Sequence, residues 1–238
     1  MKAMILAAGR GKRMMPLTAN EAKPLLSVWG RPMIEWQILR LKQAGIREFV
    51  INTAHCSDHF FPVLGDGSKY GVQIEYSVEG ALATCALETR GGVIHALEKL
   101  DFDRQNTPFI LVAGDVVTNY DYSRLVQRAL EMKHEETVAH LVLVPNPEFH
   151  LQGDMTVKEG LIVREPKHTY SCLGVFKPSI FYEATPGVSP LFPWLYEYVE
   201  RKLVSGEITD AQWANIGSPS SLATFNALAP FKGFIGDT

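Results

Sequence analysis

The sequence lacks the features of a membrane protein or of a disulfide-stabilised one. No apolar run is long enough to cross a bilayer, and the run within the opening MKAMILAAG is too short for the core of a signal peptide. The cysteines are odd in number, widely spaced and without a CxxC pair: Cys56, Cys85 and Cys172. This usage fits reduced thiols better than a disulfide framework. We therefore expect a cytoplasmic protein with no membrane partner.

Long runs of one charge are also missing. The chain carries 23 basic side chains against 26 acidic ones, which gives a net charge of −3, and the basic residues form no extended stretch. Nucleic acid is therefore not an expected partner. A small polyanion, by contrast, would need only a few well-placed cations.

Histidine and cysteine are too sparse to favour zinc or a thiol nucleophile. His55, Cys56 and His59 lie close together in AHCSDH, but no second cluster supplies further ligands at a familiar spacing. Cys85 has neither a local signature nor a histidine that the sequence would identify as its base. Both kinds of chemistry are disfavoured.

What the sequence does contain is an alternation of strand and helix patterns over 238 residues, enough for one large domain. Apolar runs bounded by turn residues predict strands at 3–7, 49–52, 73–77, 109–113 and 139–145. Helical spacing occurs at 32–44, 92–100 and 123–133. The alternation predicts an α/β fold, a Rossmann-like, mostly parallel sheet flanked by helices.

The second half of the chain is less regular. MTVKEGLIV predicts a hairpin that turns at 158–160, TYSCLGVFKP predicts another strand, and SSLATFNAL predicts a final short helix. We therefore expect the sheet to become mixed in this half.

The stretch LAAGRGKRMMPLTANEAKPL follows the first predicted strand, at the edge where open α/β sheets bind ligands. Gly9 and Gly11 would let the backbone approach a phosphate closely. Arg13 can direct two donors at phosphate oxygens, whereas Lys12 and Lys23 supply compact charges. The alternative is a plain tight turn whose cations are solvated.

Two better-known phosphate-binding patterns are absent from this stretch. Position 14 is Met, where a dinucleotide-binding loop has its third glycine, and no G-K-[ST] ending of a P-loop follows. The acidic residue expected about twenty positions after a dinucleotide loop is also hard to find. A dinucleotide-dependent oxidoreductase is therefore disfavoured.

Asp115 is the candidate metal ligand. It follows an apolar strand in FILVAGDVVT, which places it at the same sheet edge as the glycine loop. Magnesium binds oxygen ligands and retains waters, so it needs only one or two carboxylates besides phosphate. An aspartate that merely caps a turn is the alternative.

Taken together, these motifs resemble those of the sugar-1-phosphate nucleotidyltransferases. LAAGRGKRMMPLT followed by KPLLSVWGRPMIEW is similar to the signature of that family, and the similarity continues through LETRGGV, AGDVVTNYD, GVFKPSIF and IGSPSSL. Within the family the chain most resembles the short N-acetylmuramate 1-phosphate uridylyltransferases. The resemblance implies one nucleotide-diphospho-sugar transferase domain over 1–238, with a nucleotide-binding half over about 1–120 and a sugar-binding half over about 121–238.

The resemblance also implies roles for individual residues. Arg13, Lys23 and Asp115 would be catalytic, with Asp115 holding Mg²⁺. The expected nucleotide-binding residues are Leu6, Ala8, Gly9, Gly11, Lys12, Glu88, Gly91 and Gly92, with the last two lying ahead of a helix that starts at Val93. The expected sugar-binding residues are Asp154, Lys167 and Thr169, although an exposed lysine is more often simply solvated.

One departure from the family pattern concerns the metal. WANIGSP has Asn215 where relatives carry a second metal-binding aspartate, and an asparagine oxygen can coordinate a cation but brings no charge. We expect an enzyme, monomeric or weakly dimeric, that converts UTP and N-acetylmuramate 1-phosphate into a nucleotide-sugar and pyrophosphate in peptidoglycan recycling. The alternatives are a mannose-1-phosphate guanylyltransferase and a nucleotide-binding protein whose catalysis is reduced or lost because of Asn215.

Overall fold

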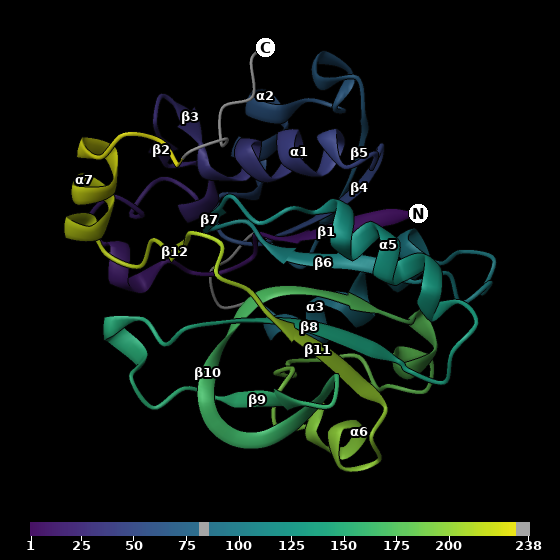
Figure 1. Cartoon of the computed structure of the whole chain (residues 1–238). Coiled ribbons are helices and arrows are strands. Elements are labelled where there is room, and N and C mark those ends of the chain that lie inside the picture. Colours follow the sequence, from purple (N-terminus) through teal and green to yellow (C-terminus); the bar gives the residue numbers. More distant parts are fainter. Residues whose placement is uncertain (81–85, 232–238) are drawn as a thin grey trace.

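The computed structural model describes residues 1–80 and 86–231, and its centre is a sheet of parallel strands (Figure 1). The parallel part has the order β6-β1-β4-β5 and consists of β1 (Lys2–Leu6), β4 (Glu48–Thr53), β5 (Gln73–Val78) and β6 (Phe109–Ala113). Ala3 lies opposite Phe49 on one side and Ile110 on the other. These strands coincide with the predicted apolar runs, which are apolar because helices cover both faces of the sheet.

The sheet continues as a mixed sheet in the second half of the chain, as predicted. The added strands are β8 (Ala139–Val144), β9 (Met155–Lys158), β10 (Leu161–Phe176) and β11 (Val204–Ile208). Strand β10 is antiparallel to β6, β8, β9 and β11, whereas β8 and β11 are parallel to each other. The two strands predicted on either side of residue 165 form one 16-residue strand, because two register shifts let β10 curl around the neighbouring strands (Figure 1).

Helices cover both faces of the sheet (Figure 1). On one face lie α1 (Met33–Gln43), α2 (Phe60–Leu64) and α5 (Ser123–Met132), and on the other lie α3 (Glu88–His95), α4 (Leu97–Leu100) and α6 (Tyr196–Glu200). Alternate side chains of a strand enter the two cores, so that Ile5 packs with the first set and Met4 with the second. Each such buried side chain contributes about 1.5–3 kcal/mol.

A third, smaller core lies beyond the carboxyl ends of the strands. It joins the ribbon of β2 (Ser27–Val28) and β3 (Arg31–Pro32), the ribbon of β7 (Val116–Thr118) and β12 (Trp213–Asn215), and the final helix α7 (Pro219–Ala227). Met14, which is fully buried in this core, anchors the loop that follows β1. Helix α7 is the short terminal helix that the sequence predicts.

The described residues also contain short 3-10 turns: η1 (Lys12–Met14), η2 (Lys23–Leu25), η3 (Ser57–His59), η4 (Ser68–Tyr70), η6 (Glu148–His150) and η7 (Pro178–Phe181). Over residues 1–80 and 86–231, none of the helices combines the length and apolar character needed to span a membrane. Cys56 and Cys172 are free thiols, and Cys85 lies outside the described residues.

Candidate functional site

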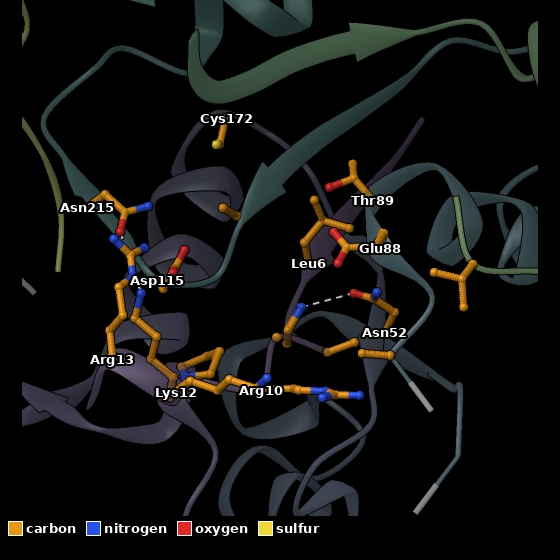
Figure 2. A pocket seen from close by; sticks show the side chains of 18 residues that line it. Leu6, Arg10, Lys12, Arg13, Asn52, Glu88, Thr89, Asp115, Cys172 and Asn215 are labelled. Atoms are coloured by element: carbon orange, nitrogen blue, oxygen red, sulfur yellow. Dashed lines mark hydrogen bonds and ion pairs between the residues drawn. The ribbon is translucent and has the colours of Figure 1, made fainter. Parts of the chain in front are cut away.

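A cavity of about 850 Å³ opens at the carboxyl ends of the central strands (Figure 2). The end of β1 and the loop after it line the cavity from 6 to 10, β4 contributes Asn52, and α3 contributes Glu88 and Thr89. Asp115 follows β6, while Cys172 belongs to β10 and Asn215 to β12. The cavity therefore brings together segments from the whole length of the chain.

The two glycines of the first loop have different physical roles. Gly11 has φ +60°, and a Cβ added there would lie 2.9 Å from Thr18 Cγ2. Thr18 Oγ1 donates to the Gly11 carbonyl (2.8 Å), and His55 Nε2 donates to the Thr18 carbonyl (2.9 Å). Gly9, by contrast, lines the cavity and has nothing within 4 Å of an added Cβ. Gly11 therefore sets the shape of the loop, and Gly9 keeps the cavity open.

Three cations of this loop line the cavity without a carboxylate partner. Lys12 and Arg13 are exposed, Arg10 is half-buried, and none of the three makes an ion pair with a described residue. Arg13 lies against the segment before α7, since a Cβ added at Gly217 would be 3.7 Å from its Cζ. An unpaired cluster of this kind attracts a small polyanion.

Lys23, Asp115 and Asn215 meet on one side of the cavity. Lys23 is only 8% exposed, and its Nζ forms an ion pair with Asp115 Oδ2 and lies 3.5 Å from Asn215 Oδ1. The pairing of β7 with β12 sets Asn215 opposite Val116 and so brings it beside Asp115. Figure 2 shows Arg13, Asp115 and Asn215 on one side of the cavity and Asn52, Glu88 and Thr89 across from them.

The glycine pair expected ahead of a helix lies inside one instead. Helix α3 begins at Glu88, so Gly91 and Gly92 belong to its first turns and neither is among the residues that line the cavity. An added Cβ would lie 2.3 Å from the Gly187 carbonyl oxygen at the first position and 2.6 Å from Glu79 Oε1 at the second. The expectation that the helix starts at Val93 is therefore wrong. Because the two glycines lack a Cβ, the helix can pack closely against the Gly187 carbonyl and the Glu79 side chain.

A polar network that sequence reasoning missed supports the floor of the cavity. Asn52, buried at the end of β4, accepts from the Ala7 amide (2.9 Å) and donates to Glu79 Oε1 (2.6 Å). Glu79 Oε2 accepts from the Leu87 amide (2.7 Å), and burial raises the pKa of the Glu79 carboxyl. The signal for this network was an asparagine within the otherwise apolar strand run FVIN.

The residues expected to bind the sugar do not line the described cavity. Asp154 accepts from His150 Nε2 and from the Tyr170 amide (both 2.9 Å). Thr169 is 6% exposed and donates to Asn146 Oδ1 (2.9 Å). Asp154 and Thr169 thus tie β10 to the loop between β8 and β9.

Lys167 is exposed and pairs with Glu165 at 3.2 Å, on the hairpin of β9 and β10. The β10 residue that does line the cavity is Cys172. Burial raises the pKa of the Cys172 thiol to about 12, and the nearby charges of Asp115 and Asp154 act in the same direction. The thiol is therefore neutral at physiological pH.

The oxygen atoms of Asp115 and Asn215 fit a hard cation. Both converge on the Lys23 ammonium, so the space between them already suits a positive charge. Among the described residues, no group of three or more His, Cys, Asp or Glu side chains could hold a metal ion. A divalent ion at this place would thus complete its ligands with phosphate oxygens and water, as Mg²⁺ commonly does.

A glycine loop, cations that pair with no described carboxylate, and an aspartate at the same sheet edge are together typical of a nucleotide-binding α/β protein. Residues 2–165 match the Nucleotidyl transferase family model, and the chain belongs to that family. It is 42% identical over 235 residues to the N-acetylmuramate alpha-1-phosphate uridylyltransferase of Neisseria meningitidis serogroup B, covering 96% of this chain and 98% of that protein. These findings confirm the predicted class, the sugar-1-phosphate nucleotidyltransferases.

More distant relatives agree with the class and the fold. The chain is 29% identical over 243 residues to a probable mannose-1-phosphate guanylyltransferase of Oryza sativa subsp. japonica, covering 94% of this chain and 63% of that protein. The solved structure of a putative glucose-1-phosphate thymidylyltransferase from Bacillus anthracis superposes with a TM-score of 0.81 at 22% identity, covering 98% of each chain. At that identity the likeness concerns the fold alone, and it confirms the predicted fold class.

Proposed function

We propose that the protein transfers the uridylyl group of UTP to N-acetylmuramate 1-phosphate in the cytoplasm, giving UDP-N-acetylmuramate and pyrophosphate. The observation that carries the proposal is that the Lys23–Asp115–Asn215 group faces the same cavity as Arg13, which pairs with no described carboxylate. The similarity to the meningococcal uridylyltransferase, over nearly the full length of both chains, supports the choice of substrates. Such a reaction would return a cell-wall amino sugar to its activated form.

The reaction joins two anions, and this determines what the site must do. A phosphate oxygen of the sugar phosphate attacks the α-phosphorus of UTP, and the bond from that phosphorus to the bridging oxygen of the β-phosphate breaks, so that pyrophosphate leaves. The attacking phosphate is already ionised, so no general base is needed. Positioning and charge stabilisation then supply the rate enhancement.

Each side of the cavity suits one part of this reaction. Gly9 lets the backbone approach the triphosphate, Arg13 stabilises charge on the β- and γ-phosphates, and Lys23 contacts the reacting phosphates. Asp115 and Asn215 would hold Mg²⁺. Bound there, Mg²⁺ would neutralise the charge that develops on the phosphates.

The base and the sugar would occupy the other sides of the cavity. Glu88 lies across from Arg13 (Figure 2), where a carboxylate can accept from the base or the ribose, and Leu6 and Ala8 provide apolar contact. We assign the sugar to the side of Cys172, which the second half of the chain supplies. This arrangement supports a nucleotide-binding half over about 1–120 and a sugar-binding half over about 121–238, within a chain that we propose acts as a monomer or weak homodimer.

One observation favours a second candidate, a nucleotide-binding protein with little turnover. Asn215 leaves Asp115 as the one carboxylate that faces Lys23 among the described residues, so the cation site carries less negative charge than two aspartates would give. Tight binding of UTP without release of pyrophosphate would identify this alternative.

The test measures pyrophosphate release by the purified protein with Mg²⁺ and matched substrate pairs. We expect UTP with N-acetylmuramate 1-phosphate to be preferred over GTP with mannose 1-phosphate, and mass spectrometry to find UDP-N-acetylmuramate. Preference for the guanylyl pair, or absence of turnover with every pair, would refute the proposed substrates. A heat-denatured sample and the Asp115→Asn variant serve as controls.

A further inference from the structure

The Lys23 ammonium occupies the space between the two residues that would hold the metal. Its Nζ donates to Asp115 Oδ2 and lies 3.5 Å from Asn215 Oδ1. The Lys23 side chain is 10% exposed and that of Asp115 is 24% exposed, so water screens the pair only in part. This lysine therefore already satisfies the oxygen atoms that a cation would need.

The charges of this group explain why a metal ion without nucleotide would bind only weakly there. Asp115 contributes one negative charge, Asn215 contributes none, and Lys23 contributes one positive charge, so the group is neutral. A divalent ion that approached the nucleotide-free protein would have to displace the ammonium and leave a buried lysine without its partner. Two aspartates would have left a net negative charge that still attracts the ion.

The other cations of the cavity differ from Lys23 in this respect. Lys12 and Arg13 form no ion pair with a described residue and lie at the exposed loop after β1. They can therefore contact an arriving triphosphate without giving up a carboxylate. A triphosphate held beside them would offer Lys23 several phosphate charges in exchange for one carboxylate, and a flexible lysine with three donors can make that exchange.

We propose that Lys23 is the internal counter-ion of the cation site and that it controls when the metal enters. In the nucleotide-free protein Lys23 holds Asp115 and Asn215; when the triphosphate binds, Lys23 moves to the phosphates and frees both oxygen donors. The metal consequently enters with the nucleotide and not before it. This inference rests on the proposed function for the identity of the polyanion, but not for the contact between the ammonium and its oxygen partners.

The test is a Mn²⁺ titration of the nucleotide-free protein, followed by the electron paramagnetic resonance signal of free Mn²⁺. We compare the wild type with Lys23→Met, which removes the ammonium at similar side-chain length. Lys12→Met is the matched control, since it removes the same charge from the same cavity without a contact to Asp115. We expect Lys23→Met to bind Mn²⁺ at least about tenfold more tightly than the wild type, and Lys12→Met to stay within about twofold.

Two further variants make the result specific. Asp115→Asn added to Lys23→Met should remove the gain in affinity, because the freed carboxylate is its source. Lys23→Gln, which keeps a hydrogen-bond donor for Asp115, should also gain affinity and tests the inference if the methionine variant does not fold, as judged by thermal unfolding. Equal affinity of the wild type and the folded Lys23 variants, or an equal gain in Lys12→Met, would overturn the proposal.

Failure of this inference is distinguishable from failure of the proposed function. The titration contains neither UTP nor sugar phosphate, so its outcome does not depend on the identity of the substrates. A gain in the Lys23 variants with no turnover by the wild type would support the counter-ion role and refute the proposed substrates. Turnover by the wild type without a gain in Mn²⁺ affinity in the Lys23 variants would support the proposed substrates and refute the counter-ion role.

Discussion

Lys23 and Asp115, separated by 92 positions in the sequence, form an ion pair at the carboxyl edge of the sheet. The lysine comes from a 3-10 turn that begins with the lysine-proline pair, and the aspartate follows the central strand β6. Their meeting places a cation, a carboxylate and the glycine loop around one cavity.

Asp115→Asn should reduce pyrophosphate release by about 100-fold or more, because the site loses its carboxylate for the metal and the partner of Lys23. Steady-state kinetics at saturating UTP and Mg²⁺ measure the effect. Asp210→Asn, an exposed aspartate that does not line the cavity, is the control and should retain wild-type rates. Similar rates for the two variants would contradict the assignment of Asp115.

Asn215→Asp should strengthen the dependence on magnesium by raising the affinity of the site for Mg²⁺. The change adds a negative charge beside Asp115 and Lys23, so a lower concentration of Mg²⁺ should give half of the maximal rate. The measurement is a Mg²⁺ titration of pyrophosphate release at fixed substrate concentrations. A titration curve that coincides with that of the wild type would count against the placement of Asn215 at the cation.

The two loop glycines should respond differently to alanine. Gly11→Ala should lower the free energy of unfolding by about 1–3 kcal/mol, because φ is +60° and the new Cβ would press on Thr18. Gly9→Ala should leave that free energy nearly unchanged and instead raise the KM for UTP, since its Cβ would enter the cavity. Denaturant unfolding and kinetics separate the two effects, and equal loss of stability in both variants would contradict this division of roles.

His140 should make the fold less stable in mild acid. Burial lowers the pKa of this histidine from 6.5 to about 4, and the nearby charges of Arg128 and Arg124 act in the same direction. Well above pH 6.5 the side chain is neutral in both the folded and the unfolded chain, so its titration has no effect on stability. As the pH falls from 6.5 towards 4, the unfolded chain takes up a proton that the folded chain excludes, and stability is lost.

The His140 contribution at pH 5 should be about 2 kcal/mol relative to pH 7. Denaturant unfolding of the wild type and of His140→Gln at both pH values measures it, since the glutamine variant does not titrate and cancels the contribution of the carboxylates. His140 also contacts Ser205 Oγ (2.9 Å), so the variant is compared with itself between the two pH values. An equal pH dependence for both proteins would show that His140 is not held neutral.

The sequence was most informative about the loops that follow the carboxyl ends of the strands. Lys23 and Asp115 could be expected together, because parallel strands bring their carboxyl ends to one edge and the flanking loops share that edge. Gly91 and Gly92 were misplaced because a glycine pair looks the same in a loop as in a helix that packs against another backbone. Local spacing does not report the position of the Gly187 carbonyl.

Long-range partners explain the other differences. Asn52 in β4 and Glu79, just after β5, are joined by a hydrogen bond between segments 27 positions apart, which no local pattern encodes. Asp154 is expected from the resemblance as a sugar ligand, and its contacts to His150 Nε2 and the Tyr170 amide could not be expected from the sequence. The curl of β10 likewise depends on its pairing with distant strands, so its two apolar stretches looked like separate strands.

Nucleotidyl transfer is defined by which product receives each phosphate of UTP. In the decisive measurement, the protein is incubated with N-acetylmuramate 1-phosphate, Mg²⁺ and UTP that carries ³²P at either the α- or the γ-position. The products are then separated and their label is counted. We predict that α-label appears in UDP-N-acetylmuramate and that γ-label appears in pyrophosphate. Transfer of γ-label to the sugar phosphate, or retention of both labels in UTP, would contradict nucleotidyl transfer at this site.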